Sequence, residues 1–152
     1  MEFVDSGKRG KEMDKSAGCI IVKEFDAEPH VLMIHAAGNW RNKKMGFPKG
    51  EIHNGESPHE TAIRETKEEV GITPIILDSL GTVKTRSGKK EVHAFIALYG
   101  DGPLDDKKAT KLQKGEVDYA KFFPIDSAIE MCYEYQRPLF ERAKKYIEKK
   151  GL

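Results

Sequence analysis

Residues 50–72 have the sequence GEIHNGESPHETAIRETKEEVGI, which predicts a helix with both of its ends defined. Ser57 is a favourable N-cap, the proline after it suits a first helical turn, and Glu60 completes a capping box. Gly71 suits the left-handed conformation in which many helices end. We therefore expect a helix over residues 58–70, with the rest of the domain built around it.

Two faces of this helix differ in character. Side chains expected to face the core share one side: Ala62, Ile63, Thr66 and Val70. Glutamates share another arc of about 100°: Glu65, Glu68 and Glu69. A solvated acidic face is the ordinary explanation for such a run. However, clustered glutamates repel by roughly 0.2–0.5 kcal/mol per pair, and the helix dipole disfavours anions near the C-terminus. A divalent cation removes this conflict, because Mg²⁺ binds carboxylate oxygens and leaves positions open for phosphates.

The pattern G-x5-E-x7-R-E-x2-E-E-x-G-hydrophobic occupies eight positions of this stretch: Gly50, Glu56, Arg64, Glu65, Glu68, Glu69, Gly71 and Ile72. It resembles the Nudix box. One position departs from the family pattern, because Thr66 stands where an aliphatic residue is usual. The Thr66 hydroxyl therefore needs a hydrogen-bond partner inside the core.

The resemblance implies an α/β fold, a Nudix-type α/β/α sandwich with a mixed sheet, that hydrolyses P–O–P bridges with divalent metal. It implies Mg²⁺, with Mn²⁺ as a substitute, held by Glu65, Glu68 and Glu69, one of which may serve as the base. Gly50 would let the backbone approach the metal, although a plain turn glycine is the simpler explanation. Arg64 would orient a glutamate by ion pairing, although an exposed helical arginine fits its spacing nearly as well. Glu56 would be a structural partner.

A further carboxylate from outside the box often completes Nudix sites as a ligand or base. Glu116 is our first choice, with Glu91 and Asp118 as rivals and an unrelated surface glutamate as the alternative. Lys49, in the segment GFPKG, is placed to contact a phosphate. A basic rim is predicted from further residues: Arg41, Lys43, Lys44, Lys84, Arg86, Lys89 and Lys90. Tyr135 is the candidate for stacking on a base, with Trp40 and Tyr133 as alternatives.

The segment GFPKG, at residues 46–50, resembles the Nudix branch that acts on dinucleoside polyphosphates and diphosphoinositol polyphosphates. Diadenosine tetraphosphate is therefore our expected type of substrate. The alternatives are pyrophosphate removal from an RNA 5′ triphosphate, hydrolysis of diphosphoinositol polyphosphates, and a nucleotide-sensing Nudix module without catalysis. The three glutamates argue against such a sensor, because a degenerate site would be expected to lose ligands.

Composition limits the wider possibilities. The length of 152 residues suits one domain. The formal net charge of +1 gives no support for general nucleic-acid binding, although an RNA 5′ end stays possible as a substrate. Two cysteines without close spacing indicate reduced thiols. The sequence shows neither a signal peptide nor a membrane span. We expect a cytoplasmic monomer or homodimer that binds a small nucleotide.

The remaining elements follow from apolar patterning. A flexible leader is expected over residues 1–15 and a single domain over 16–152. Loops are predicted at 24–29, 38–45, 85–90 and 100–115. Strands are predicted at 16–23, 30–36, 74–84, 91–99 and 117–123, and helices at 126–133 and 134–149. The strand at 74–84 is expected to be interrupted at 79–81.

Overall fold

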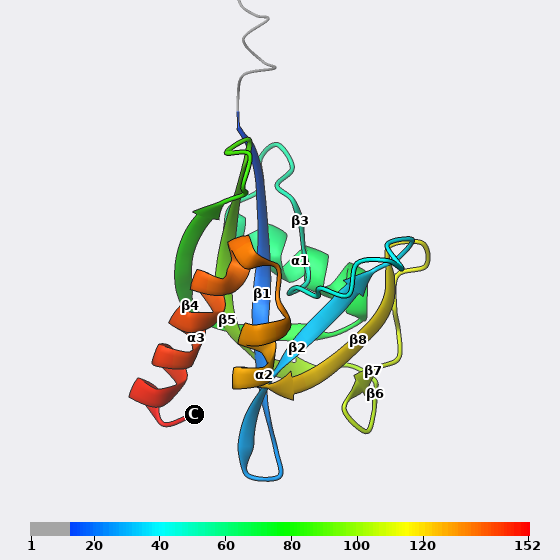
Figure 1. Ribbon diagram of the computed structural model, residues 1–152, viewed down its shortest axis with the longest axis vertical. Coiled ribbons are helices and arrows are strands. Elements are labelled where there is room, and N and C mark those ends of the chain that lie inside the picture. The colour runs from blue at the N-terminus through cyan, green and yellow to red at the C-terminus, as the bar shows by residue number, and fades with distance from the viewer. Residues whose placement is uncertain (1–12) are drawn as a thin grey trace, which may run out of the picture.

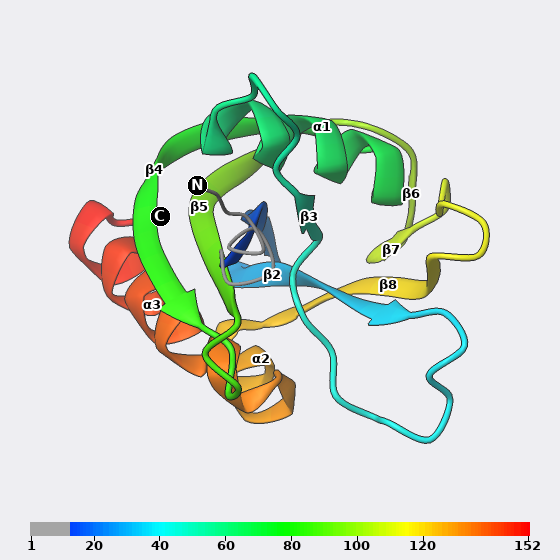
Figure 2. The ribbon, with the colours of Figure 1, turned by 90° about the horizontal axis from the view of Figure 1, so that it is seen from above.

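The computed structural model describes residues 13–152, which form a mixed sheet with helices on both faces (Figures 1 and 2). The strands are β1 (Asp14–Phe25), β2 (Glu28–Ala36), β3 (Lys49–Glu51), β4 (Thr73–Lys84), β5 (Lys90–Asp101), β6 (Leu104–Asp105), β7 (Lys108–Ala109) and β8 (Val117–Pro124). The helices are α1 (Pro58–Val70), α2 (Ile125–Met131) and α3 (Arg137–Lys150), with a 3₁₀ turn, η2 (Glu134–Gln136), before α3.

The sheet runs in the order β4-β5-β1-β2-β8-β7-β6, and β3 pairs with β1. β1 and β5 are parallel, whereas the other pairs are antiparallel. In Figure 2, α1 covers one face of the sheet, and α2 and α3 lie on the other side. The α/β/α sandwich with a mixed sheet is therefore confirmed. Within residues 13–152, no helix is both long and apolar enough to cross a membrane.

β1 lies at the centre of the core because both of its faces are covered. Cys19 and Ile21 belong to the apolar cluster beneath α1, whereas Ile20 and Val22 belong to the cluster beneath α2 and α3. A strand buried on both faces has an unbroken apolar sequence instead of an alternating one. This explains why residues 17–22 are all apolar or small.

Helix α1 begins and ends at the predicted residues. The Ser57 hydroxyl accepts the Glu60 amide at 3.1 Å, and the Glu60 carboxylate accepts the Ser57 amide at 2.9 Å, which completes the capping box. Gly71 ends the helix in the left-handed region with φ of 67°. The Thr66 hydroxyl donates to the Ala62 carbonyl at 2.8 Å and so has the partner that its burial requires.

The predicted core face of α1 needs one correction. Ile63 is only partly buried, while Thr61 and Glu69 are buried with Ala62, Thr66 and Val70. The buried side of the helix therefore includes two polar residues, Thr61 and Glu69, that apolar patterning does not indicate. Thr61 can lie there because its hydroxyl donates to the Glu56 carboxylate at 2.8 Å.

Several element bounds also differ from expectation. β1 ends at Phe25 and β2 begins at Glu28. The turn between them therefore consists of Asp26 and Ala27 alone, both with positive φ. β3 was not predicted, because three residues carry too short a pattern. The predicted interruption of β4 is confirmed, since its pairing with β5 shifts register at 76–78 and 79–81.

The C-terminal segments are close to their predicted positions. The first helix spans 125–131 and the second begins at Arg137, because 134–136 form a separate 3₁₀ turn. Its expected core residues are buried: Leu139, Ala143 and Ile147. Cys19 and Cys132 are buried free thiols.

Two expected irregular segments contain regular structure. The loop predicted at 100–115 includes the short hairpin of β6 and β7. The leader predicted at 1–15 is wrong for Asp14 and Lys15, which lie in β1 and pair with β5. Met13 lies just before β1, and residues 1–12 of that leader lie outside the described residues.

The basic segment at 38–45 is tied to the sheet through His35. Its Nδ1 lies 2.8 Å from an Asp118 carboxylate oxygen, and its Nε2 lies 2.6 Å from the Asn42 carbonyl oxygen. Both partners are acceptors, so the doubly protonated ring satisfies both bonds. The Asn42 carbonyl and then Asp118 raise the pKa of His35 above its ordinary value. The positive form of His35 therefore fastens this segment to β8.

We expect D118N to lower the pKa of His35, because the variant removes the carboxylate that stabilises the imidazolium. In the wild type, the stabilisation by His35 is complete below its ordinary pKa and is lost as pH rises through the raised value. Titration of the ring by NMR measures the pKa, and chemical denaturation at several pH values measures the stabilisation. D126N, which removes the partner of Lys144, is the matched control. An equal His35 pKa in D118N and D126N would contradict this account.

Candidate active site

The Arg64 guanidinium is the centre of a network of acidic residues on α1. Its Nε and Nη2 donate to the two Glu56 carboxylate oxygens at 2.6 and 3.0 Å. Its Nη1 donates to Glu65 at 2.8 Å and to Glu68 at 3.1 Å. Nη2 also donates to the Glu51 carbonyl at 3.1 Å. Arg64 therefore orients these carboxylates and is not a free surface arginine.

Glu56, just before the helix, has a structural part in this network. Besides Arg64, its carboxylate accepts the Thr61 hydroxyl and the His53 amide at 3.1 Å. The Arg64 guanidinium, followed by Thr61, lowers the pKa of Glu56 to about 2. Glu56 is therefore ionised at neutral pH and ties the chain entering α1 to the second turn of the helix.

Gly50 is a glycine because the Glu65 carboxylate lies directly against it. A Cβ placed on Gly50 would overlap the carboxylate carbon and both oxygens of Glu65. The backbone of β3 therefore approaches α1 more closely than any other residue type would allow. Gly50 therefore lies in a strand and not in a plain turn, while its expected place beside a metal stays a prediction.

Glu69 has no hydrogen bond to Arg64 among the described residues and is the most deeply buried of the three glutamates in the acidic arc. Its side chain accepts the Lys49 backbone amide at 3.1 Å, and the residue is 9% exposed. Burial, and then the Glu65 charge, raise the pKa of Glu69 to about 8. Without a cation, much of the Glu69 population is therefore protonated at neutral pH.

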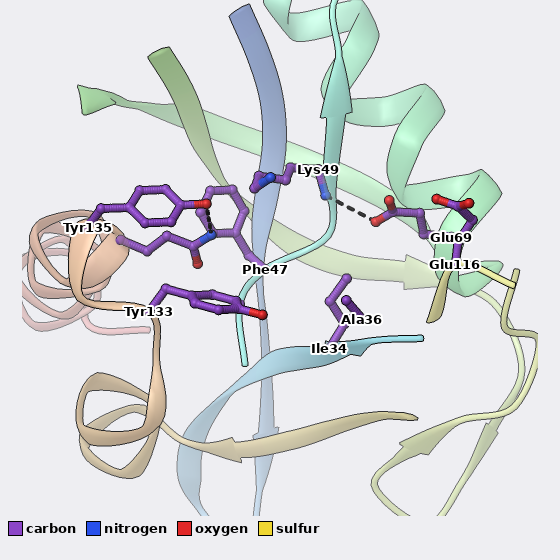
Figure 3. Close-up of a pocket in the computed structure, with 10 residues that line it drawn as sticks. Ile34, Ala36, Phe47, Lys49, Glu69, Glu116, Tyr133 and Tyr135 are labelled. Atoms are coloured by element: carbon purple, nitrogen blue, oxygen red, sulfur yellow. Dashed lines mark hydrogen bonds between the residues drawn. The ribbon is translucent and has the colours of Figure 1, made fainter. Parts of the chain in front are cut away.

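Glu69 lies at one end of a cavity of about 360 Å³. The lining residues are Ile34, Ala36, Gly46, Phe47, Lys49, Glu69, Glu116, Tyr133, Tyr135 and Gln136. Figure 3 shows Glu69 and Glu116 close together at one end, with Tyr133 and Tyr135 at the other. The cavity thus has an acidic end and an aromatic end, and its volume lies in the range of small-molecule sites.

Glu116, the first choice for the carboxylate outside the box, lines this cavity, and its charge contributes to the raised pKa of Glu69. Its rivals do not line it. Asp118 lies 2.8 Å from His35, and Glu91 lies near the start of β5, where it is the strand-register partner of Lys15 in β1. The geometry therefore supports Glu116 over both rivals, and its role remains a prediction.

The five predicted substrate-binding residues separate into two groups. Lys49 and Tyr135 line the cavity. Arg41, Lys43 and Arg86 do not, so the basic rim does not form part of the cavity wall. Arg41 instead lies over the ring of Trp40 at 4.7 Å, and Arg86 lies in the turn between β4 and β5. Basic residues that are scattered along the sequence did not converge here because they belong to separate turns.

The residues of the acidic end fit a divalent cation. Glu69 is a buried carboxylate beside Glu65 and Glu116, and an ionised carboxylate needs a positive partner when buried. Within residues 13–152, however, no three metal-binding side chains are gathered around one point. Glu65 and Glu68 face Arg64, whereas Glu69 faces Lys49. Assignment of Glu65, Glu68, Glu69 and Gly50 to the metal therefore remains a prediction.

Five residues of the cavity wall were not predicted: Ile34, Ala36, Gly46, Phe47 and Gln136. Phe47 and Gln136 are buried, and Gly46 leaves the space in which the Gln136 amide lies. Phe47 and Gly46 belong to GFPKG, so that segment could have indicated them. Gln136 carries no signal of this kind, because only the fold brings η2 to the start of β3.

Comparison with known proteins agrees with the fold and the box. The model of the NUDIX domain family matches residues 13–147. The chain therefore belongs to this family. It is 28% identical to Nudix hydrolase 4 of Arabidopsis thaliana over 71% of this chain and 51% of the relative. It is 27% identical to RNA pyrophosphohydrolase of Nitratiruptor sp. over 69% of this chain and 74% of the relative.

Among solved structures, a binary complex of the C. elegans Ap4A hydrolase is similar, with 25% identity and a TM-score of 0.72. The match covers 90% of this chain and 99% of that one. The chain spans only 20–56% of the length of curated relatives from Mycobacterium tuberculosis, Bifidobacterium longum and Arabidopsis thaliana. The family is therefore established, whereas substrate and activity are inferred below.

We expect E69Q to stabilise the metal-free protein at pH 9. The raised pKa means that ionising Glu69 costs stability, and this cost grows from pH 4.5 up to about pH 8. Gln removes the charge and can still accept the Lys49 amide, so unfolding in EDTA should require roughly 2–4 kcal/mol more. E68Q, at a more exposed glutamate, should change stability little. Equal denaturation midpoints for E69Q and wild type at pH 9 would contradict this assignment.

Proposed function

We propose that this protein is a Mg²⁺-dependent pyrophosphohydrolase that cleaves a P–O–P bridge in dinucleoside polyphosphates, with diadenosine tetraphosphate as the best candidate. The observation that carries the proposal is the cavity, which joins a carboxylate pair to a pair of tyrosines. A nucleoside at the aromatic end places its phosphates toward Lys49 and Glu69. The similarity to the C. elegans Ap4A hydrolase supports the same substrate class.

Each side chain of the acidic end has a defined part in this proposal. Lys49 binds a phosphate oxygen, and Glu65, Glu68 and Glu69 hold Mg²⁺, with Gly50 giving the backbone room beside Glu65. Bound Mg²⁺ would neutralise phosphate charge and acidify a water molecule. Glu116 accepts a proton from the attacking water, although one box glutamate could take that role instead. Phosphoryl transfer needs little more from a protein than this positioning and charge neutralisation.

Arg64 acts through the glutamates and does not contact substrate in this proposal. Its bonds to Glu56, Glu65 and Glu68 keep the acidic arc folded against β3. Glu65 and Glu68 share only Nη1 of Arg64, whereas Glu56 binds Nε and Nη2. Glu65 and Glu68 can therefore turn toward a cation while Arg64 stays paired with Glu56.

The cavity wall favours a nucleotide over a diphosphoinositol polyphosphate. Among residues 13–152, Lys49 is the only basic residue that lines it, whereas an inositol ring with many phosphates needs several cationic partners. Two tyrosines instead offer flat apolar surface for a base, with ring centroids 6.1 Å apart. An RNA 5′ triphosphate shares the base and the phosphates, and the similarity to an RNA pyrophosphohydrolase keeps it as the second candidate.

The test is a turnover assay with Mg²⁺ or Mn²⁺ on three substrates: diadenosine tetraphosphate, a triphosphorylated RNA oligonucleotide and a diphosphoinositol polyphosphate. Products are separated by anion-exchange chromatography. We expect the dinucleotide to have the highest kcat/KM and EDTA to abolish its turnover. Faster release of pyrophosphate from RNA would replace our first substrate with the second. Binding of nucleotide with no turnover of any substrate would point to a sensing module.

We further expect E69Q to lower kcat by at least about 100-fold, because it removes charge at the acidic end. E116Q should also lower kcat, whereas E91Q should not, because Glu91 lies outside the cavity. Circular dichroism checks that all three variants are folded. Full activity of E69Q with Mg²⁺ would remove the proposed metal site, and equal activities of E116Q and E91Q would remove the role of Glu116.

A further inference from the structure

Among residues 13–152, one buried side-chain polar atom has no hydrogen-bond partner, the Oε1 of Gln136. The residue is only 1% exposed and lines the aromatic end of the cavity. An unpaired buried acceptor costs stability, and such groups are rare in native proteins. A ligand that donates an N–H to this oxygen would explain why the protein keeps an unpaired acceptor at this position.

The Gln136 amide is held in place by its surroundings. Its Nε2 donates to the Tyr135 hydroxyl at 2.9 Å. A Cβ on Gly46 would come within 2.6 Å of Oε1, so the glycine provides the space in which the amide lies. The amide thus has one free acceptor and one further N–H, since Tyr135 uses only one of its two hydrogens.

Neighbouring backbone groups are already satisfied. The Gly46 amide donates to the Ile34 carbonyl at 3.0 Å, and the Ile34 amide donates to the Gly46 carbonyl at 2.7 Å. The aromatic end is otherwise formed by Phe47 and the two tyrosine rings. Within residues 13–152, Gln136 is therefore the fully buried side chain at this end that has an unpaired acceptor for a base.

We propose that Gln136 is the specificity residue that selects adenine at this end of the cavity, an inference that rests on the proposed nucleotide function. Oε1 accepts from the 6-amino group, and the remaining Nε2–H donates to the adjacent ring nitrogen, the bidentate pairing that an amide makes with adenine. Hypoxanthine and guanine carry a 6-carbonyl oxygen, which would face Oε1 without a hydrogen between them.

Access to the amide requires a movement. Oε1 is shielded from solvent, so adenine must displace a neighbouring side chain to reach it. We assign that movement to Tyr133, a partly exposed ring of the same wall. The displaced ring then stacks on the base, which supplies apolar contact without base selectivity. Selectivity thus belongs to Gln136, and general nucleotide affinity belongs to the tyrosines.

The experiment is isothermal titration calorimetry of the full chain with ADP and with inosine 5′-diphosphate, in EDTA so that binding is separated from cleavage. The two ligands differ at the 6 position, opposite Oε1, and at the neighbouring N1, which carries a hydrogen only in inosine. We expect ADP to bind about 10- to 100-fold more tightly. Q136M, which keeps the side-chain length but removes both polar atoms, should make the two affinities nearly equal without lowering the denaturation midpoint. Q113M, the same change outside the cavity wall, should keep the wild-type preference.

The outcomes separate this inference from the proposed function. Equal affinities of the wild type for ADP and inosine 5′-diphosphate, or an unchanged preference in Q136M, would overturn the role of Gln136 even if the dinucleotide is cleaved. A preference for ADP that Q136M removes supports it even if the dinucleotide is not cleaved. If Q136M fails to fold, Y135F serves as the second variant, because it removes the hydroxyl that holds the Gln136 amide. A reduced preference for ADP in Y135F would support the role of Gln136, and an unchanged preference would overturn it.

Discussion

The Arg64 guanidinium binds carboxylates that would otherwise repel one another on a single short helix. Glu56 takes two of its donors, and Glu65 and Glu68 share a third. Repulsion within the acidic arc is thereby offset before any cation is present, and α1 can pack its other side on β1. The same interaction therefore orients the acidic side chains and reduces their repulsion within the folded helix.

Glu69 stands apart from this compensation. Among residues 13–152, the Lys49 amide is the one hydrogen-bond partner of its side chain, and burial beside Glu65 makes its ionised form costly. The protein thus concentrates its electrostatic cost at one carboxylate, next to the place where substrate phosphates would lie. A site of this kind is destabilising by itself and becomes favourable when a cation occupies it, which is common for functional carboxylates.

The cavity is assembled from segments that are far apart in the chain. β2 and the GFPKG segment form one wall, α1 and the residue before β8 supply the carboxylates, and the turn before α3 supplies the tyrosines and Gln136. Figure 3 shows that these segments converge on one opening between the two ends. A fold that keeps one acidic helix can therefore change its cavity by changing the loops around that helix.

Local sequence determined the helix, its caps, the acidic arc and the central apolar strands, because each of these follows from hydrogen bonds and spacings within a few residues. The bounds of α1 and the partner of Thr66 were predictable for that reason. Only the tertiary structure decided that Gly50 lies under Glu65, that Glu116 joins Glu69 while Arg41 and Arg86 do not, and that Gln136 reaches the cavity. Those relations depend on strand pairing between distant residues, whose geometry no local pattern encodes.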